Sequence, residues 1–251
     1  MRSRTVHLLS WFAGLAGLAI VVWYFRPSDF ISQVESVGVW GGFGWLFLTL
    51  CARMLLVEVA VLPIRALGYS FRRADAFWLG WIRTFVNQIV PLLGLAIYSR
   101  EVRRKANIPW SVVVALSTPM VLLAAAALSV IGLFAVLSNA EYMGQSGIPM
   151  LITFAVVGSG SVFVATHVAW MIDRLPGATH LFAEQSAAAF RRLSDCNRLI
   201  AGLIGLHVLA ILVRGARIWL LFVLFGAEMS VAAAVLVIVI AESTTLFQVT
   251  P

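Results

Sequence analysis

The sequence predicts an all-α polytopic membrane protein with about five transmembrane helices and two re-entrant, broken-helix segments in an inverted repeat. The first observation is composition: 61% of the residues are hydrophobic, 12% are charged, and the mean hydropathy is +0.97. Such a chain has too little polar surface to cover a soluble globule. The second is a four-residue pattern that ends two apolar segments: a Gln, a β-branched residue, one further residue and a Pro. It occurs at Gln88 to Pro91 and at Gln248 to Pro251.

A spanning helix needs about 20 mostly apolar residues. Five segments meet that length: residues 6–24, 39–62, 110–137, 149–172 and 199–225. The first follows Arg2 and Arg4, as the apolar part of a signal peptide would. Its downstream flank, Trp23-Tyr24-Phe25-Arg26, is too bulky for a cleavage site of the small-x-small type. We therefore expect a retained anchor helix.

The charges of the loops predict the orientation, because cytoplasmic loops carry an excess of Lys and Arg. The N-terminus and the stretches 63–77 and 99–109 are basic, and the linker 173–198 is weakly so. The stretches 25–38, 138–148 and 226–230 each sum to minus one and are expected on the other side. The predicted location is a bacterial-type cytoplasmic (inner) membrane, with the N-terminus in the cytoplasm.

The apolar stretch 78–98 has a basic loop at both ends, so a single crossing would violate the charge rule. A re-entrant hairpin that turns between Asn87 and Gly94 removes the conflict, because Pro91 interrupts a helix there. The alternative is that the stretch spans and the rule is violated once. With the hairpin, the 231–251 segment enters from the outside. The chain is then one membrane domain, 1–251, whose inverted repeat halves are at about 39–109 and 196–251. Paired broken helices in the two halves of a repeat are typical of transporter binding sites.

Several charged residues fall inside the apolar segments. Each costs about 2.5–3.5 kcal/mol near the centre of a bilayer, so each must face protein, water or another charge. Arg214 and Arg217 share a helix face and suit a phosphate, which guanidinium groups bind bidentately. The alternative is that Arg217 snorkels toward the interface near Trp219, and that Glu242 neutralises Arg214. The full set is Arg53, Glu58, Arg83, Arg214, Arg217 and Glu242.

Arg83 and Glu242 stand eight and nine residues before their prolines, so both should approach the midplane from opposite faces. They suit either a zwitterionic or cationic headgroup, or a salt bridge to each other. Arg53 and Glu58 point about 140° apart on a helix and need separate partners. Asn87 and Gln88 can bind a headgroup or the backbone groups that Pro91 leaves free. The candidate substrate-binding residues are Arg83, Asn87, Gln88, Pro91, Gly94, Arg214, Arg217, Glu242, Gln248 and Pro251.

Six further segments form a pattern of Gly, Pro and Arg spacings in apolar sequence. They are Leu67-Gly68-Tyr69-Ser70, Asn87-Gln88-Ile89-Val90-Pro91 with Gly94, the basic run from Arg100 to Lys105, Asn107-Ile108-Pro109-Trp110, Leu224 to Ser230 and Phe247-Gln248-Val249-Thr250-Pro251. On these segments the chain resembles the transmembrane region of the lysylphosphatidylglycerol synthases, the flippase-like family, over nearly its whole length. The family usually has Gly four residues after the first Pro and Arg four after that; here Gly94 follows Pro91 by three, and the next Arg is Arg100.

The resemblance implies a free-standing flippase-like protein, not an enzyme, that moves a phospholipid or a lipid-linked headgroup between leaflets. The implied partners are membrane lipids, among them anionic or aminoacylated phospholipids, and also a lipid-modifying enzyme or a second copy of the chain. Family members continue past the second Pro with a Gly-rich stretch, so the sequence is expected to be truncated at Pro251.

Two other functions stay open. A polyprenyl diphosphate phosphatase also uses inverted repeats, but its chemistry needs clustered acids with a nucleophile or His beside arginines. Glu242, Ser243 and Thr244 form the one such group in the sequence. The other reading is a non-transporting membrane partner of a lipid-modifying or glycosyl transferase. The histidines have no ligand spacing, so we expect no metal site. We also expect no cofactor and no nucleic-acid partner.

Overall fold

The computed structural model describes residues 27–90, 93–172, 188, 191–193 and 196–247. Every regular element in this part of the chain is a helix, as predicted. The elements are α2 (Pro27–Ala66), α3 (Arg73–Ile89), α4 (Leu93–Ala106), α5 (Trp110–Ser138), α6 (Ala140–Met143), the 3-10 turn η1 (Gly144–Ser146), α7 (Gly147–Ile172), α9 (Asn197–Leu224) and α10 (Val231–Phe247).

Four of these helical stretches are long and apolar enough to cross a membrane, which indicates an integral membrane protein. They are Val37–Ala66, Pro119–Ser138, Ala140–Val164 and Arg198–Leu224. These stretches correspond to four of the five expected crossings, and the expected helix at residues 6–24 lies outside the described residues. The apolar part of α10, Val231–Ser243, is shorter.

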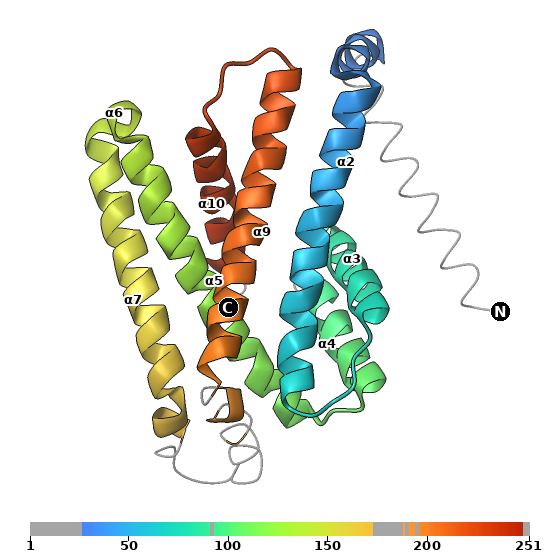
Figure 1. Ribbon diagram of the computed structural model, residues 1–251, viewed down its shortest axis with the longest axis vertical. Coiled ribbons are helices and arrows are strands. Elements are labelled where there is room, and N and C mark those ends of the chain that lie inside the picture. The colour runs from blue at the N-terminus through green and yellow to red at the C-terminus, as the bar shows by residue number, and fades with distance from the viewer. Residues whose placement is uncertain (1–26, 91–92, 173–187, 189–190, 194–195, 248–251) are drawn as a thin grey trace, which may run out of the picture.

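The expectation of a loop over residues 25–38 is wrong for most of its length. Pro27–Val37 forms the first part of α2, which then bends at Gly38 with φ 63° and ψ 168°. Figure 1 shows this part turned away from the long remainder of the helix. Pro27 suits the first position of a helix, and Gly38 adopts the positive φ that other residues avoid.

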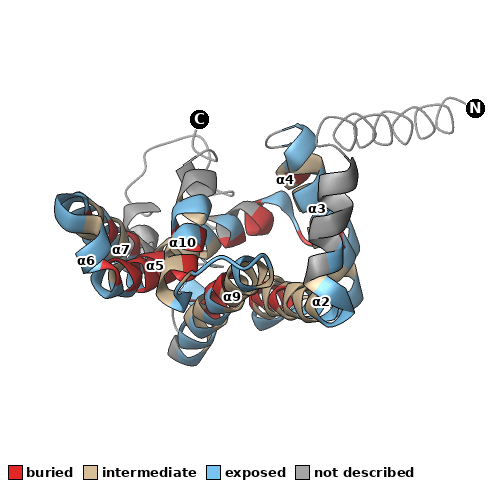
Figure 2. Ribbon diagram, turned by 90° about the horizontal axis from the view of Figure 1, so that it is seen from above, coloured by how far each residue is buried: buried red, intermediate tan, exposed pale blue. Residues whose placement is uncertain are grey.

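The long helices pack antiparallel in one bundle (Figure 1). α2 descends, α5 and α9 rise, and α7 descends beside α5. Close approach is possible where one helix presents a glycine to its neighbour. Gly41 of α2 lies against Leu224 of α9, and Gly215 of α9 lies against Val235 of α10. Figure 2 shows the resulting layout from above, with buried residues concentrated where the helices meet.

The predicted hairpin is present as two helices, α3 and α4, that fold back on each other. α3 ends at Ile89 and α4 begins at Leu93, inside the expected interval from Asn87 to Gly94. An ion pair between Lys105 and Asp75 joins their far ends. The two ends of the hairpin therefore lie at the same end of the bundle.

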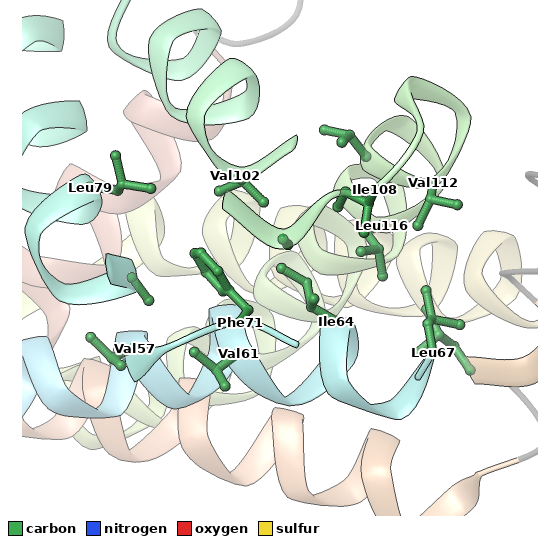
Figure 3. Close-up of a cluster of buried hydrophobic side chains, with 14 residues drawn as sticks. Val57, Val61, Ile64, Leu67, Phe71, Leu79, Val102, Ile108, Val112 and Leu116 are labelled. Atoms are coloured by element: carbon green, nitrogen blue, oxygen red, sulfur yellow. The ribbon is translucent and has the colours of Figure 1, made fainter. Parts of the chain in front are cut away.

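A cluster of buried side chains fixes the base of the hairpin against α2 and the start of α5 (Figure 3). Val61 and Phe71 are at its centre, with 0% and 2% of their surfaces exposed. Leu79 of α3 and Val102 of α4 contact the same cluster. Burial of apolar surface therefore anchors the hairpin at its open end, and α3 rises from there to about mid-height of the bundle (Figure 1).

The two ends of the bundle differ in charge. We call the end with the hairpin base the basic end. Among the described residues of the opposite end, the charged side chains are acidic, at Glu35, Glu141 and Glu228. α10 runs from that acidic end to mid-height, opposite in direction to α3 (Figure 1). These directions fit an inverted repeat, which itself stays a prediction. The cations of the basic end include Arg65, Arg72, Arg73, Arg100, Arg103, Arg104 and Lys105.

A labelling experiment tests whether the hairpin is re-entrant. With Cys51 and Cys196 replaced by Ser, single cysteines at Arg72 and Arg104 should react with an impermeant maleimide from the same membrane face. A cysteine at Glu141 should react from the opposite face. Labelling of positions 72 and 104 from opposite faces would show that the 78–98 stretch crosses the membrane.

Candidate functional site: two groups of arginines inside the bundle

The first group lies where α2, α9 and α10 meet. Arg214 of α9 forms an ion pair with Glu242 of α10, and its Nε donates to the carbonyl oxygen of Ala210 at 3.2 Å. Of the alternatives left open by the sequence, the structure thus shows Glu242 paired with Arg214 and not with Arg83. The pair leaves Arg214 little positive charge to offer a ligand.

Arg217 takes a different direction from Arg214, although both belong to α9. Its guanidinium carbon lies 5.5 Å from the centre of the Trp45 ring of α2, and Nη1 donates to Thr49 Oγ1 over a long 3.4 Å. It thus points to α2 rather than to the interface near Trp219. Arg217 Nε and the indole Nε1 of Trp45 are both buried without an acceptor among the described residues. Two N–H donors are therefore unused next to one positive charge.

The second group lies where α2, α3 and α4 meet. The guanidinium carbon of Arg53 lies 4.9 Å from the centre of the Trp81 ring, and that of Arg83 lies 5.6 Å from the ring of Tyr98. The Arg53 guanidinium also lies against Gly80, which precedes Arg83 by three residues on the same side of α3. Arg53 Nε and Nη2 are buried without an acceptor in the described part of the chain. This group therefore gathers two arginines that repel each other.

No carboxylate among the described residues forms an ion pair with Arg53 or Arg83. The acids of this half of the bundle have other partners: Glu58 binds Arg73, and Asp75 binds Lys105. Glu101 binds Arg104 in the same way. Arg53 and Glu58 thus have separate partners, as their spacing predicted. The second group keeps two positive charges, whereas Glu242 reduces the first group to one.

Aromatic contacts alone do not offset the burial of the donors of Arg53 and Arg217, whereas Arg83 is exposed. A desolvated cation–π contact contributes about 2 kcal/mol. An arginine near the bilayer centre costs about 2.5–3.5 kcal/mol, and each buried donor without an acceptor adds about 1–3 kcal/mol. An anion that supplied oxygen acceptors would remove most of this cost. Both groups are therefore suited to bind an anion, and the fork of a guanidinium matches phosphate.

Of the remaining predicted site residues, those that the structure describes lie near the end of α3 and the start of α4. Asn87 is half-buried with Oδ1 lacking a partner, and Gln88 is exposed. Gly94 is buried, and a side chain there would collide with the carbonyl oxygen of Arg83 and with Asn87. Gly94 therefore serves the close packing of α3 on α4. Pro91, Gln248 and Pro251 lie outside the described residues.

Sequence reasoning missed the role of α2. Trp45, Thr49 and Arg53 recur every four residues and face both groups of arginines. This spacing places them on one side of a helix, and it was the signal available in the sequence. It could not identify their partners, because Arg217 and Trp81 come from distant parts of the chain.

Other chemistry has less support in the described part of the chain. No group of three or more His, Cys, Asp or Glu residues there could hold a metal. The Ser243 hydroxyl donates to the carbonyl oxygen of Val239 at 2.7 Å, an arrangement typical of a serine within a helix rather than of an activated nucleophile. An apolar pocket of ≈ 520 Å³ lies between α5 and α7, away from both groups of arginines, and is lined by residues such as Ser129, Phe154 and Gly158.

Comparison of the chain with protein-family models, with curated proteins and with solved structures finds no match. The resemblance to the flippase-like family therefore rests on the residues quoted from the sequence.

The pair between Arg214 and Glu242 can be tested by its effect on stability. Replacing Arg214 with Gln removes the ion pair with Glu242, and should lower the free energy of unfolding by up to about 3 kcal/mol. The second replacement, Glu242→Gln, should restore most of this loss. Thermal unfolding of the purified protein in detergent measures both effects. Additive losses in the double variant would show that the two side chains do not stabilise each other.

Proposed function

We propose that the protein is flippase-like and moves a phosphate-bearing lipid headgroup between the leaflets of a membrane. One observation carries the proposal: Arg217 is held inside the bundle with a buried Nε donor that has no acceptor. Trp45 contributes a second unused donor beside it. A phosphate oxygen would satisfy these donors and the charge at once.

The net charge of the first group favours a phosphodiester. Arg214 and Arg217 provide two positive charges, and Glu242 removes one through its ion pair with Arg214. A phosphodiester carries a single negative charge, as in the headgroup of an anionic or an aminoacylated phospholipid. Binding such a group would leave the site near neutrality, which lowers the cost of holding it within a bilayer.

The helix directions support a path for the headgroup. The hairpin rises from the basic end, and α10 descends from the acidic end, so both end at mid-height (Figure 1). Backbone groups at such ends cannot face hydrocarbon and would line a polar route. The headgroup would follow this route while its acyl chains stay in lipid, and rocking of one half against the other would expose it alternately. The basic end is proposed to face the cytoplasm.

Transport by an Arg217 variant tests the proposal. Vesicles containing the protein and a fluorescent phosphatidylglycerol report translocation by the loss of dithionite-resistant signal over time. Arg217→Gln removes a charge-assisted hydrogen bond of about 1.5–3 kcal/mol, so translocation should slow about 10- to 100-fold. Arg198→Gln, on the exposed start of the same helix, serves as the matched control and should translocate at the unmodified rate.

Two results would contradict the proposal. The first is unmodified protein that does not translocate the lipid above the rate of empty vesicles. The second is a rate in Arg217→Gln vesicles equal to that of the Arg198→Gln control.

A further inference from the structure

We infer that Arg53, Arg83 and Tyr98 form a second anion-binding site, which takes a phosphate ester and prefers a monoester. The site lies in the half of the bundle that contains the hairpin, apart from the group around Arg217. The inference rests on the proposed function only for its biological ligand, a lipid headgroup. The binding chemistry follows from the residues themselves.

Three helices each contribute one group to this site. Arg53 comes from α2, Arg83 from α3 and Tyr98 from α4. The Arg53 guanidinium lies against Gly80, which precedes Arg83 by three residues on the same side of α3. The rings of Trp81 and Tyr98 lie under the two guanidinium groups and hold them in place. Two donors of Arg53, Nε and Nη2, lack an acceptor in the described part of the chain. The hydroxyl of Tyr98 can donate as well.

The charge of the site points to a monoester. Arg53 and Arg83 have no carboxylate partner among the described residues, because Glu58, Asp75 and Glu101 pair with other cations. A phosphate monoester carries about −1.5 to −2 charges at neutral pH, whereas a diester carries one. Two neighbouring arginines are thus better matched by a monoester, which would also relieve their mutual repulsion.

Gly80 sets the position of Arg53. A Cβ atom at Gly80 would lie 2.6 Å from Arg53 Nη2 and 2.7 Å from its Cζ, so the guanidinium occupies space that only glycine leaves free. The same contact encloses the unused donors between α2 and α3. A ligand therefore reaches them when α3 separates slightly from α2 at Gly80.

The position of the site on α2 suggests how it serves transport. Thr49 lies one helical turn from Arg53 on the same face, about 6 Å along the axis. Thr49 already accepts a hydrogen bond from Arg217. A phosphate leaving the second site would therefore meet the group around Arg217, the first site, about one turn farther along α2.

Calorimetric titration of the purified full chain tests the second site directly. Maltoside micelles contain no phosphate, so they leave the site free for added ligand. Dihexanoyl phosphatidic acid is the monoester probe, dihexanoyl phosphatidylglycerol is the diester probe, and dihexanoylglycerol is the phosphate-free control. The chain carries Arg217→Gln, so that the first site does not contribute. We expect the monoester to bind more tightly than the diester, and the phosphate-free lipid to bind least.

Two pairs of variants assign the binding to these residues. Arg53→Gln combined with Arg83→Gln should weaken monoester binding by about tenfold or more. Arg72→Gln, exposed at the start of α3, should not. Gly80→Ala should also weaken binding because it displaces Arg53. Gly42→Ala should not, because a Cβ atom there meets nothing within 4 Å. If the double arginine variant does not fold, the two glycine variants decide.

The outcomes separate this inference from the proposed function. Absence of monoester binding, or equal affinity in Gly80→Ala and Gly42→Ala, would overturn the second site whatever the vesicles show. Monoester binding without translocation by the unmodified protein would overturn the proposed function alone. Inorganic phosphate that displaces the monoester lipid at equal concentration would support the site and assign it to free phosphate. Weaker displacement by inorganic phosphate would assign the site to the lipid headgroup.

Discussion

A guanidinium group inside a bilayer must have a partner, because neither lipid nor an empty space can replace its hydration. This constraint determines which helices of the bundle must meet. Arg214 satisfies it through Glu242, which ties α9 to α10. Arg217 satisfies it only in part, through Trp45 and Thr49, which orient it toward α2. The Nε of Arg217 and the indole Nε1 of Trp45 remain without an acceptor among the described residues, and an anion could accept from both.

The arginines near the hairpin also need partners, but the carboxylates of this half of the bundle are paired with other cations. The acids near the basic end are engaged: Asp75 of α3 pairs with Lys105 of α4, and Glu58 of α2 pairs with Arg73 of α3. These pairs close the base of the hairpin and help to dock it on α2. They also leave no described carboxylate for Arg53 and Arg83. The same ion pairs therefore have two consequences. They hold the base of the hairpin closed, and they leave the positive charges of Arg53 and Arg83 available to an anion.

The sequence predicts the helices better than it predicts their contacts. Long apolar runs indicate the crossings. The basic loops at both ends of the 78–98 stretch, with Pro91 between them, indicate the hairpin. Both signals are local properties of the chain. The helix at Pro27–Val37 was missed because it is too polar to be read as a crossing. The partners of the arginines could not be predicted from the sequence either. A long side chain has several possible neighbours, and only the packing of α2 on α9 brings Arg217 to Trp45.

The central claim is that a polar route, rather than lipid, surrounds the tip of the hairpin at the middle of the bilayer. A spin label at Gln88 in reconstituted protein, with Cys51 and Cys196 replaced, measures both depth and surroundings by power-saturation spectroscopy. The account predicts a label near the bilayer centre whose relaxation is enhanced by a water-soluble nickel chelate. A label at that depth that responds to oxygen alone would place the tip in hydrocarbon and contradict the account.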